Sequence, residues 1–283
     1  MTSLSRFPFA INLSTACLIP LPLATTLRLA AEAGYDGVEL VLSGEVARLG
    51  TSKALSLASQ HGLNVHTVHQ PLMAWGRWRL LVARAEAAVR LALELGCKAA
   101  VIHSPLAYHY RAPCVQEWIV AVERCVRLAE GSAVQIALEN PPYAAHAGRL
   151  PILSDPLELM GFAREHDLAV TFDTCHAGTA RLDLVAAYQA LRGRLVNVHL
   201  SDQRASAPQL ARGRLASVLT DHQMPGVGGL ALHDLVQRLA QDGYKGPLTV
   251  EVNPVALGSL CPLLRQRNLQ RILAYIRQAA QPG

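Results

Sequence analysis

Four short apolar runs in this sequence each carry, at or near their ends, an ionisable side chain that can bind a metal or transfer a proton. The runs VQIALEN, AVTFDTCH, LVNVHLSD and PLTVEVN contribute Glu139, Asp173, His199 and Glu251. A carboxylate in an otherwise apolar segment is costly to bury unless it is paired or binds a metal. One such residue could have a purely structural role, but matching positions in four runs indicate a shared site.

Further ionisable residues accompany other apolar runs and could complete such a site. His69 ends NVHTVH, His103 begins HSP, Glu39 lies within GVELVL, and His176 follows Asp173 closely. We expect these residues to contact substrate or to orient the metal ligands. They add imidazole and carboxylate groups to the predicted site.

Two neighbouring residues have simpler interpretations. His66 precedes His69 by three residues, so in a regular strand its side chain points to the opposite face and packs in the core. Cys175 stands between Asp173 and His176, and we expect it to be a small buried apolar side chain.

Apolar, β-branched runs alternate with longer amphipathic stretches along the chain, which is typical of βα units around a parallel sheet. Gly34, Gly62 and Gly96 stand where a helix should end before a strand. A repeat of about 30 residues predicts an α/β protein with one domain over residues 1–283, a closed parallel eight-stranded TIM (β/α)₈ barrel. A doubly wound sheet is the alternative, but no Gly-rich fingerprint follows the first strand. The expected strands are 9–14, 37–42, 64–69, 99–104, 134–140, 169–174, 195–201 and 248–253.

In a TIM barrel, the C-terminal ends of all strands meet at one mouth, where active sites lie. Three carboxylates and an imidazole gathered there include like charges that repel one another, and a divalent cation removes this repulsion. We therefore expect Glu139, Asp173, His199 and Glu251 to hold a divalent metal. Such a ligand set suits Mn²⁺, Zn²⁺, Co²⁺ or Fe²⁺, whereas Mg²⁺ fits less well with an imidazole among the ligands.

The composition describes a globular chain with a large core. Of 283 residues, 51% are hydrophobic and 17% charged, and the mean hydropathy is +0.21. The formal net charge of +5 comes without clusters of arginine, which argues against nucleic acid as a partner. Six cysteines without a CxxC pair fit reduced thiols in a cytoplasmic protein, and a homo-oligomer is compatible with all of this.

The sequence offers no membrane segment. Pro20 and Pro22 interrupt the apolar N-terminal stretch, so we interpret it as a first strand and its loop rather than a signal peptide. No run reaches the roughly 18 apolar residues that a transmembrane helix needs.

Eight motifs resemble those of the xylose isomerase-like TIM barrels, which include sugar epimerases, inosose dehydratases and endonuclease IV, the last an AP endonuclease of family 2 type. They are GVEL, VHQP, VIHSP, ALENPP, TFDTCHAG, NVHLSD, DHQMPGVG and VEVNP, in the family's order over most of the chain. For the epimerases, the resemblance implies one metal held by Glu139, Asp173, His199 and Glu251, with the two glutamates also moving protons. For endonuclease IV, it implies three zinc ions. The matching ligands would be His69, His103, Glu139, Asp173, His176, His199, His222 and Glu251.

The sequence departs from the endonuclease IV pattern near His222. The resemblance implies a further zinc-binding Asp two residues earlier, where this chain has Thr220, and Asp221 is out of register. Val227 replaces the Glu usual in the family's GEG turn. A neutral Thr cannot supply the charge of a trinuclear zinc site, which argues against a three-metal nuclease but leaves one or two metals open.

The leading hypothesis is a metal-dependent isomerase or epimerase acting on a small-molecule sugar or polyol. Glu139 and Glu251 would remove and return the α-proton beside a carbonyl, through an enediolate. The connection 203–227 is long and holds Arg204, Arg212 and Arg214, which could cover the site or bind an anionic group. For Arg212 and Arg214, a solvated loop is the preferred interpretation.

Three alternatives remain open. The first is an endonuclease IV-like zinc phosphodiesterase acting on abasic DNA, which requires a basic face beside the mouth. The second is an inosose dehydratase-like lyase, because dehydration shares the same proton abstraction. The third is a barrel that binds a metal or metabolite without turnover.

Overall fold

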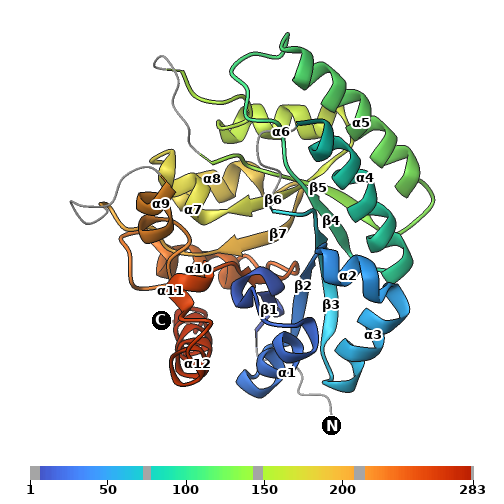
Figure 1. Ribbon diagram of the computed structural model, residues 1–283. Coiled ribbons are helices and arrows are strands. Elements are labelled where there is room, and N and C mark those ends of the chain that lie inside the picture. The colour runs from blue at the N-terminus through green and yellow to red at the C-terminus, as the bar shows by residue number, and fades with distance from the viewer. Residues whose placement is uncertain (1–6, 73–77, 143–148, 207–213, 282–283) are drawn as a thin grey trace.

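Eight parallel strands form a closed barrel in the computed structural model, which describes residues 7–72, 78–142, 149–206 and 214–281 (Figure 1). Each strand pairs with the next in the chain, and β8 pairs with β1. This confirms the predicted TIM barrel and each of its predicted strands; the largest difference is at β8, which ends at Val250 rather than at 253. The strands are β1 Ile11–Ser14, β2 Gly37–Val41, β3 Asn64–His69, β4 Ala99–Ile102, β5 Gln135–Glu139, β6 Ala169–Asp173, β7 Leu195–Leu200 and β8 Leu248–Val250.

Long helices cover the outside of the barrel, and short helices follow several strands directly. Figure 1 shows α4 and α5 side by side along one side of the barrel and α12 on the opposite side. The long helices are α1 Leu23–Ala33, α3 Thr51–Gln60, α4 Trp78–Leu95, α5 Pro113–Ala129, α6 Pro156–Glu165, α8 Leu184–Leu191, α10 Leu232–Gln241 and α12 Pro262–Ala279. The short ones are η1 Thr15–Leu18, α2 Gly44–Leu49, α7 Thr174–Thr179, α9 Arg214–Thr220 and α11 Pro254–Leu257.

The sequence of α5 explains why it forms a helix and which face it buries. Pro113 occupies the first turn, where a missing backbone N–H costs nothing. Val115, Trp118, Val122 and Cys125 follow at helical spacing and are buried against the barrel. Gly96, which follows the last residue of α4, takes a positive φ of 64°, as its place at a helix end predicts.

Alternation along the strands places small residues at the bottom of the barrel and functional ones at its mouth. Ala137 packs with Ala99 and Ala169, which are the first residues of β4 and β6. Glu139 lies two residues after Ala137 and so points to the same, interior side. The interior between bottom and mouth is polar; Asn12, Thr67, Thr171, Asn197 and Thr249 are all fully buried there.

His66 does not pack as expected. The pairing of β2 with β3 shifts register between Val38 and Glu39, so His66 is an extra, bulged residue and the alternation assumed for it fails. Its Nδ1 lies 2.7 Å from Asn12 Oδ1. A Cβ atom at Gly37 would lie 2.7 Å from the same nitrogen, so the imidazole needs the space that the glycine leaves.

In the parts of the chain described, no helix is both long and apolar enough to cross a membrane.

Candidate active site and metal centre

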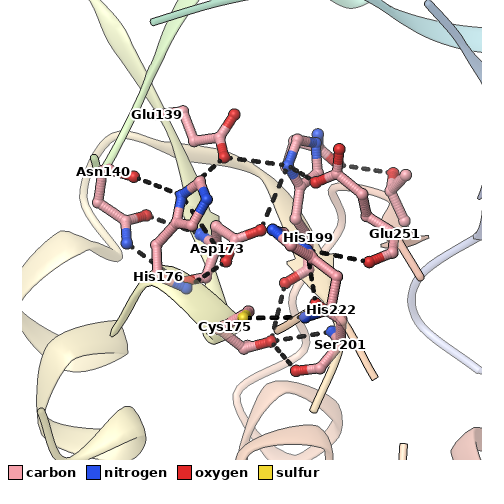
Figure 2. Close-up of polar contacts among 12 residues, drawn as sticks. Glu139, Asn140, Asp173, Cys175, His176, His199, Ser201, His222 and Glu251 are labelled. Carbon is pink, nitrogen blue, oxygen red and sulfur yellow. Dashed lines mark hydrogen bonds and ion pairs between the residues drawn. The ribbon is translucent and has the colours of Figure 1, made fainter. Parts of the chain in front are cut away.

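The barrel brings the four predicted ligands together at its mouth. Glu139 and Asp173 end β5 and β6, His199 lies in β7, and Glu251 follows β8 directly. All four are buried, and one ligand atom from each lies within 4.8 Å of the others. Figure 2 shows their side chains converging from neighbouring strands.

His199 is the centre of this group. Its Nε2 atom lies 3.0 Å from Glu39 Oε2, on the side away from the other ligands. Its Nδ1 atom lies 2.8 Å from Glu251 Oε2, 3.6 Å from Glu139 Oε1 and 3.8 Å from Asp173 Oδ2. The Nδ1 edge of the imidazole thus lies close to three carboxylates.

Two atoms at this centre are buried without a hydrogen-bond partner: Asp173 Oδ2 and His199 Nδ1. Although Nδ1 is close to Glu251, the two are not in hydrogen-bond geometry. Buried polar atoms normally have a partner, so lone pairs left over at a shared point fit a cation. Carboxylate oxygens and an imidazole nitrogen form a donor set that suits a divalent metal.

In the absence of a metal, the positive charge among these carboxylates is that of a protonated His199. Burial lowers the pKa of His199, but the charges of Glu39, Glu251 and Glu139 outweigh burial and raise that pKa well above its usual value. Burial raises the pKa of Glu251, but the charge of His199 holds it below its usual range. Burial raises the pKa of Asp173, in keeping with its unpaired oxygen. A divalent cation would replace the imidazolium as the partner of these carboxylates.

A second group consists of His69, His103 and Glu139. The two Nε2 atoms lie 3.0 Å apart, and Glu139 Oε2 lies 2.9 Å from that of His103 and 3.3 Å from that of His69. Because His69 Nδ1 donates to the Gln70 carbonyl oxygen at 2.5 Å, its Nε2 carries the lone pair in the neutral ring. Burial lowers the pKa of His69, but the hydrogen bond to Glu139 and the surrounding carboxylates raise it to about 9.

A third group consists of Asp173, His176 and His222. His176 Nδ1 donates to the Asn140 carbonyl oxygen at 2.9 Å, and its backbone N–H donates to Asp173 Oδ1 at 2.6 Å. His222 Nδ1 lies 3.2 Å from the Glu251 carbonyl oxygen. Burial lowers the pKa of His176, but the charges of Asp173 and Glu139 raise it to about 10.

Neither Thr220 nor Asp221, at the C-terminal end of α9, adds a carboxylate to the third group. Thr220 Oγ1 lies 3.0 Å from the Ala216 carbonyl oxygen and 2.9 Å from Asp221 Oδ1. The same Asp221 oxygen faces Gln203 Nε2 at 3.5 Å, so this carboxylate is engaged outside the group. In the described residues, Asp173 is the one carboxylate of this group.

The remaining predicted residues lie at different depths. His69 and His199 are fully buried, whereas the side chains of His103 and His176 are 28% and 13% exposed. The two exposed imidazoles and Glu139 line a cavity of about 160 Å³. Of the described residues in the cluster, His103, His176 and Glu139 can therefore contact a ligand in that cavity.

The structure does not bring Arg204 to the cluster. Its side chain is exposed and lines a separate pocket between α9 and α11, with Val218 and Val255. Arg212 lies outside the described residues, as does the side chain of Arg214.

Asp202, which follows His199 by three residues in the sequence, has a structural role. Its carboxylate accepts hydrogen bonds from the backbone N–H groups of Gln203, Gly226, Gly228 and Leu230 at 2.8–3.0 Å. It thereby fixes the loop before α10.

Sequence reasoning missed two residues that hold the ligands in place. The Asn140 side chain accepts from the Asp173 N–H at 2.7 Å and donates to the Asp173 carbonyl oxygen at 3.0 Å, bridging β5 and β6. Thr174 Oγ1 accepts from the Ser201 N–H at 3.0 Å, and its one hydroxyl proton lies within reach of two carbonyl oxygens, that of Ser201 at 2.7 Å and that of His199 at 3.1 Å. Each of the two residues directly follows a predicted ligand in the sequence, and this position is the feature from which their role could have been predicted.

Comparisons with known proteins agree with this architecture. A family model described as xylose isomerase-like TIM barrel matches residues 27–278. An uncharacterized protein of Mycobacterium tuberculosis is 27% identical over 267 residues, 86% of this chain and 88% of its own.

Solved structures are similar in fold at low identity. A 3-keto-D-glucoside 4-epimerase from E. coli is 19% identical, with a TM-score of 0.68 over 95% of this chain and 99% of its own. An AP endonuclease, family 2, from Brucella melitensis is 20% identical, with a TM-score of 0.70 over 94% and 98%. At such identities the likeness establishes the fold alone.

Proposed function

Because this chain belongs to the xylose isomerase-like TIM barrel family, we propose that it is a metal-dependent sugar or polyol isomerase or epimerase. One observation carries the proposal: the carboxylates of Glu139 and Glu251 meet at the same buried point as the unpaired atoms of Asp173 and His199. Proton-transfer groups and metal ligands therefore share one site. The fold is also that of a 3-keto-D-glucoside 4-epimerase, which is consistent with this reaction class.

A divalent cation, Mn²⁺, Zn²⁺ or Co²⁺, held by Glu139, Asp173, His199 and Glu251 would polarise a substrate carbonyl and acidify the neighbouring C–H. The protein must then supply a base. Burial raises the pKa of Glu139, but the charges of His103 and His199 outweigh burial and hold it well below its usual value. Glu139 is therefore ionised at neutral pH, as a group that removes a proton must be.

Glu251 is the partner group that returns the proton. It follows β8 directly and is buried, with Oε2 beside His199. We propose that one glutamate takes the α-proton and the other delivers it, through an enediolate of the substrate.

His103 and His176 are suited to bind the substrate's oxygens. Both are partly exposed and line the cavity of about 160 Å³ beside Glu139. Because His176 Nδ1 donates to Asn140, its ring is held in one orientation. We propose that a neutral sugar or polyol occupies this cavity and the adjoining mouth.

A zinc phosphodiesterase acting on abasic DNA is the second candidate, since two further groups around Glu139 and Asp173 could each hold an ion. The fold is also that of an AP endonuclease. Against it stands Thr220, which adds no carboxylate to the group of His176 and His222. A lyase shares the proton abstraction and differs only in the later loss of water.

The test is solvent deuterium exchange into the α-carbon of common ketoses and inososes, with metal content measured on the same preparation. We expect about one ion per chain and exchange by the wild-type protein. A dehydratase would exchange and also release a dehydrated product, detected by mass spectrometry. If the protein exchanges no α-proton but incises abasic DNA with bound zinc, the phosphodiesterase replaces the isomerase.

A further inference from the structure

Glu39 lies beneath the metal centre and joins strands on opposite sides of the barrel. It belongs to β2 and is fully buried. Its Oε2 atom accepts hydrogen bonds from Thr67 Oγ1 of β3 at 2.9 Å and from Asn197 Nδ2 of β7 at 3.1 Å. His199 Nε2 lies 3.0 Å from the same oxygen.

The partners of Glu39 determine which nitrogen of His199 carries a proton. Thr249 Oγ1 donates to Asn197 Oδ1 at 2.9 Å, which orients the Asn197 amide with its NH₂ group toward Glu39. Oε2 is thus an acceptor for Thr67 and Asn197 alike, and the adjoining imidazole nitrogen must donate to it as well. His199 Nε2 therefore holds a proton, and Nδ1 presents its lone pair to the three carboxylates when the ring is neutral.

The oxygen of Glu39 that faces His199 is a hydrogen-bond acceptor rather than a metal ligand. The Glu39 carboxylate lies close enough to His69, His199 and Glu251 to count as part of a ligand set, and its Oε1 atom is buried without a hydrogen-bond partner. Its Oε2 atom, however, faces three groups that can donate to it, Thr67 Oγ1, Asn197 Nδ2 and His199 Nε2.

We propose that Glu39 is a positioning residue that fixes the tautomer and orientation of His199 for metal binding through Nδ1. The inference rests on the proposed metal centre and adds to it Glu39, the group that orients one of its ligands. The opposite tautomer would place an N–H toward Glu139, Asp173 and Glu251 and could not bind an ion through that nitrogen. A carboxylate behind a metal-binding imidazole also increases the basicity of the ring.

The test compares Glu39→Gln with Tyr35→Phe in the purified protein. Tyr35→Phe removes a buried hydrogen bond, to the Leu269 carbonyl oxygen, that lies outside the network of Glu39 and His199, so it is the control for a merely structural effect. We expect Glu39→Gln to weaken zinc binding by about 10–100-fold, measured by competition with a chromophoric chelator. Tyr35→Phe should lower thermal stability but leave zinc affinity at the wild-type value. Equal zinc affinity in Glu39→Gln and wild type, or equal losses in both variants, would overturn the proposal.

A measurement on the wild type alone keeps the proposal testable if Glu39→Gln does not fold. In ¹⁵N-labelled protein loaded with ¹¹³Cd, NMR should detect cadmium coupling to Nδ1 of His199 and a proton on Nε2. Coordination through Nε2 refutes the proposal. If the wild type binds no divalent ion, the proposed function and this inference both fail; if it binds one but exchanges no α-proton, only the function fails.

Discussion

The Nε2 atoms of His69 and His103 lie 3.0 Å apart. Two lone pairs at this distance repel, so a proton or a cation must lie between them. Glu139 Oε2 lies within 3.3 Å of both nitrogens, while Glu139 Oε1 faces His199 at 3.6 Å. Glu139 therefore links the protonation of this histidine pair to the group around His199, which we propose to bind the metal.

The stabilisation of the folded protein by bound metal should increase with pH between about 6.5 and 9. The folded pKa of His69 is raised to about 9, above the unfolded value of about 6.5. The stability contributed by protonated His69 is complete below about pH 6.5 and is lost as pH rises through about 9. A cation held by Glu139 repels the proton on His69, whose Nε2 atom lies 3.3 Å from Glu139 Oε2, so metal binding becomes stronger over the same interval. Calorimetry should find a larger difference in Tm between loaded and metal-free protein at pH 9 than at pH 6.5. A constant difference would contradict proton-linked binding.

Replacing either of the two glutamates that we propose to transfer protons should strongly reduce proton exchange while the barrel stays folded. Glu139→Gln and Glu251→Gln keep the shape of the side chain but remove the base, so exchange into substrate should fall by about 10²–10⁴-fold. The comparison requires preparations of matched metal content. Glu158→Gln is the control, because Glu158 lies on α6 and pairs with Tyr110 at 2.8 Å, outside the cluster. Exchange at the wild-type rate in both site variants would show that other groups move the proton.

The loop anchor Asp202 should matter for stability more than any exposed aspartate. Asp202→Asn leaves one acceptor oxygen for four backbone N–H donors and turns an NH₂ group toward some of them. We expect a loss of about 1–3 kcal/mol in the free energy of unfolding, measured with urea. The control Asp167→Asn changes a side chain that is 84% exposed and should stay within about 0.5 kcal/mol of wild type. Equal effects would contradict the role of Asp202.

The sequence predicts those parts of the site that depend on strand periodicity. Glu139 and Asp173 end buried runs, and a barrel must bring such ends together, so their meeting could be foreseen. His66 could not be placed, because a single bulged residue reverses the side to which a strand residue points and leaves no mark in the pattern. Arg204 was expected near the site from its loop alone, and the direction of a long loop is set by packing that no local pattern encodes.

The number of metal ions separates the two candidate functions, and His103 provides the test. In the proposed isomerase, His103 binds substrate at the partly exposed edge of the cavity, and the ion belongs to the group around His199. His103→Ala should therefore retain about one ion and raise KM by up to about tenfold, the equivalent of one hydrogen bond. Asp173→Asn removes a charge from the central group and should release the ion. Dialysis against a weak chelator followed by metal analysis measures both. If His103→Ala loses an ion that Asp173→Asn retains, then His69, His103 and Glu139 hold a metal of their own, and the phosphodiesterase becomes the better account of the site.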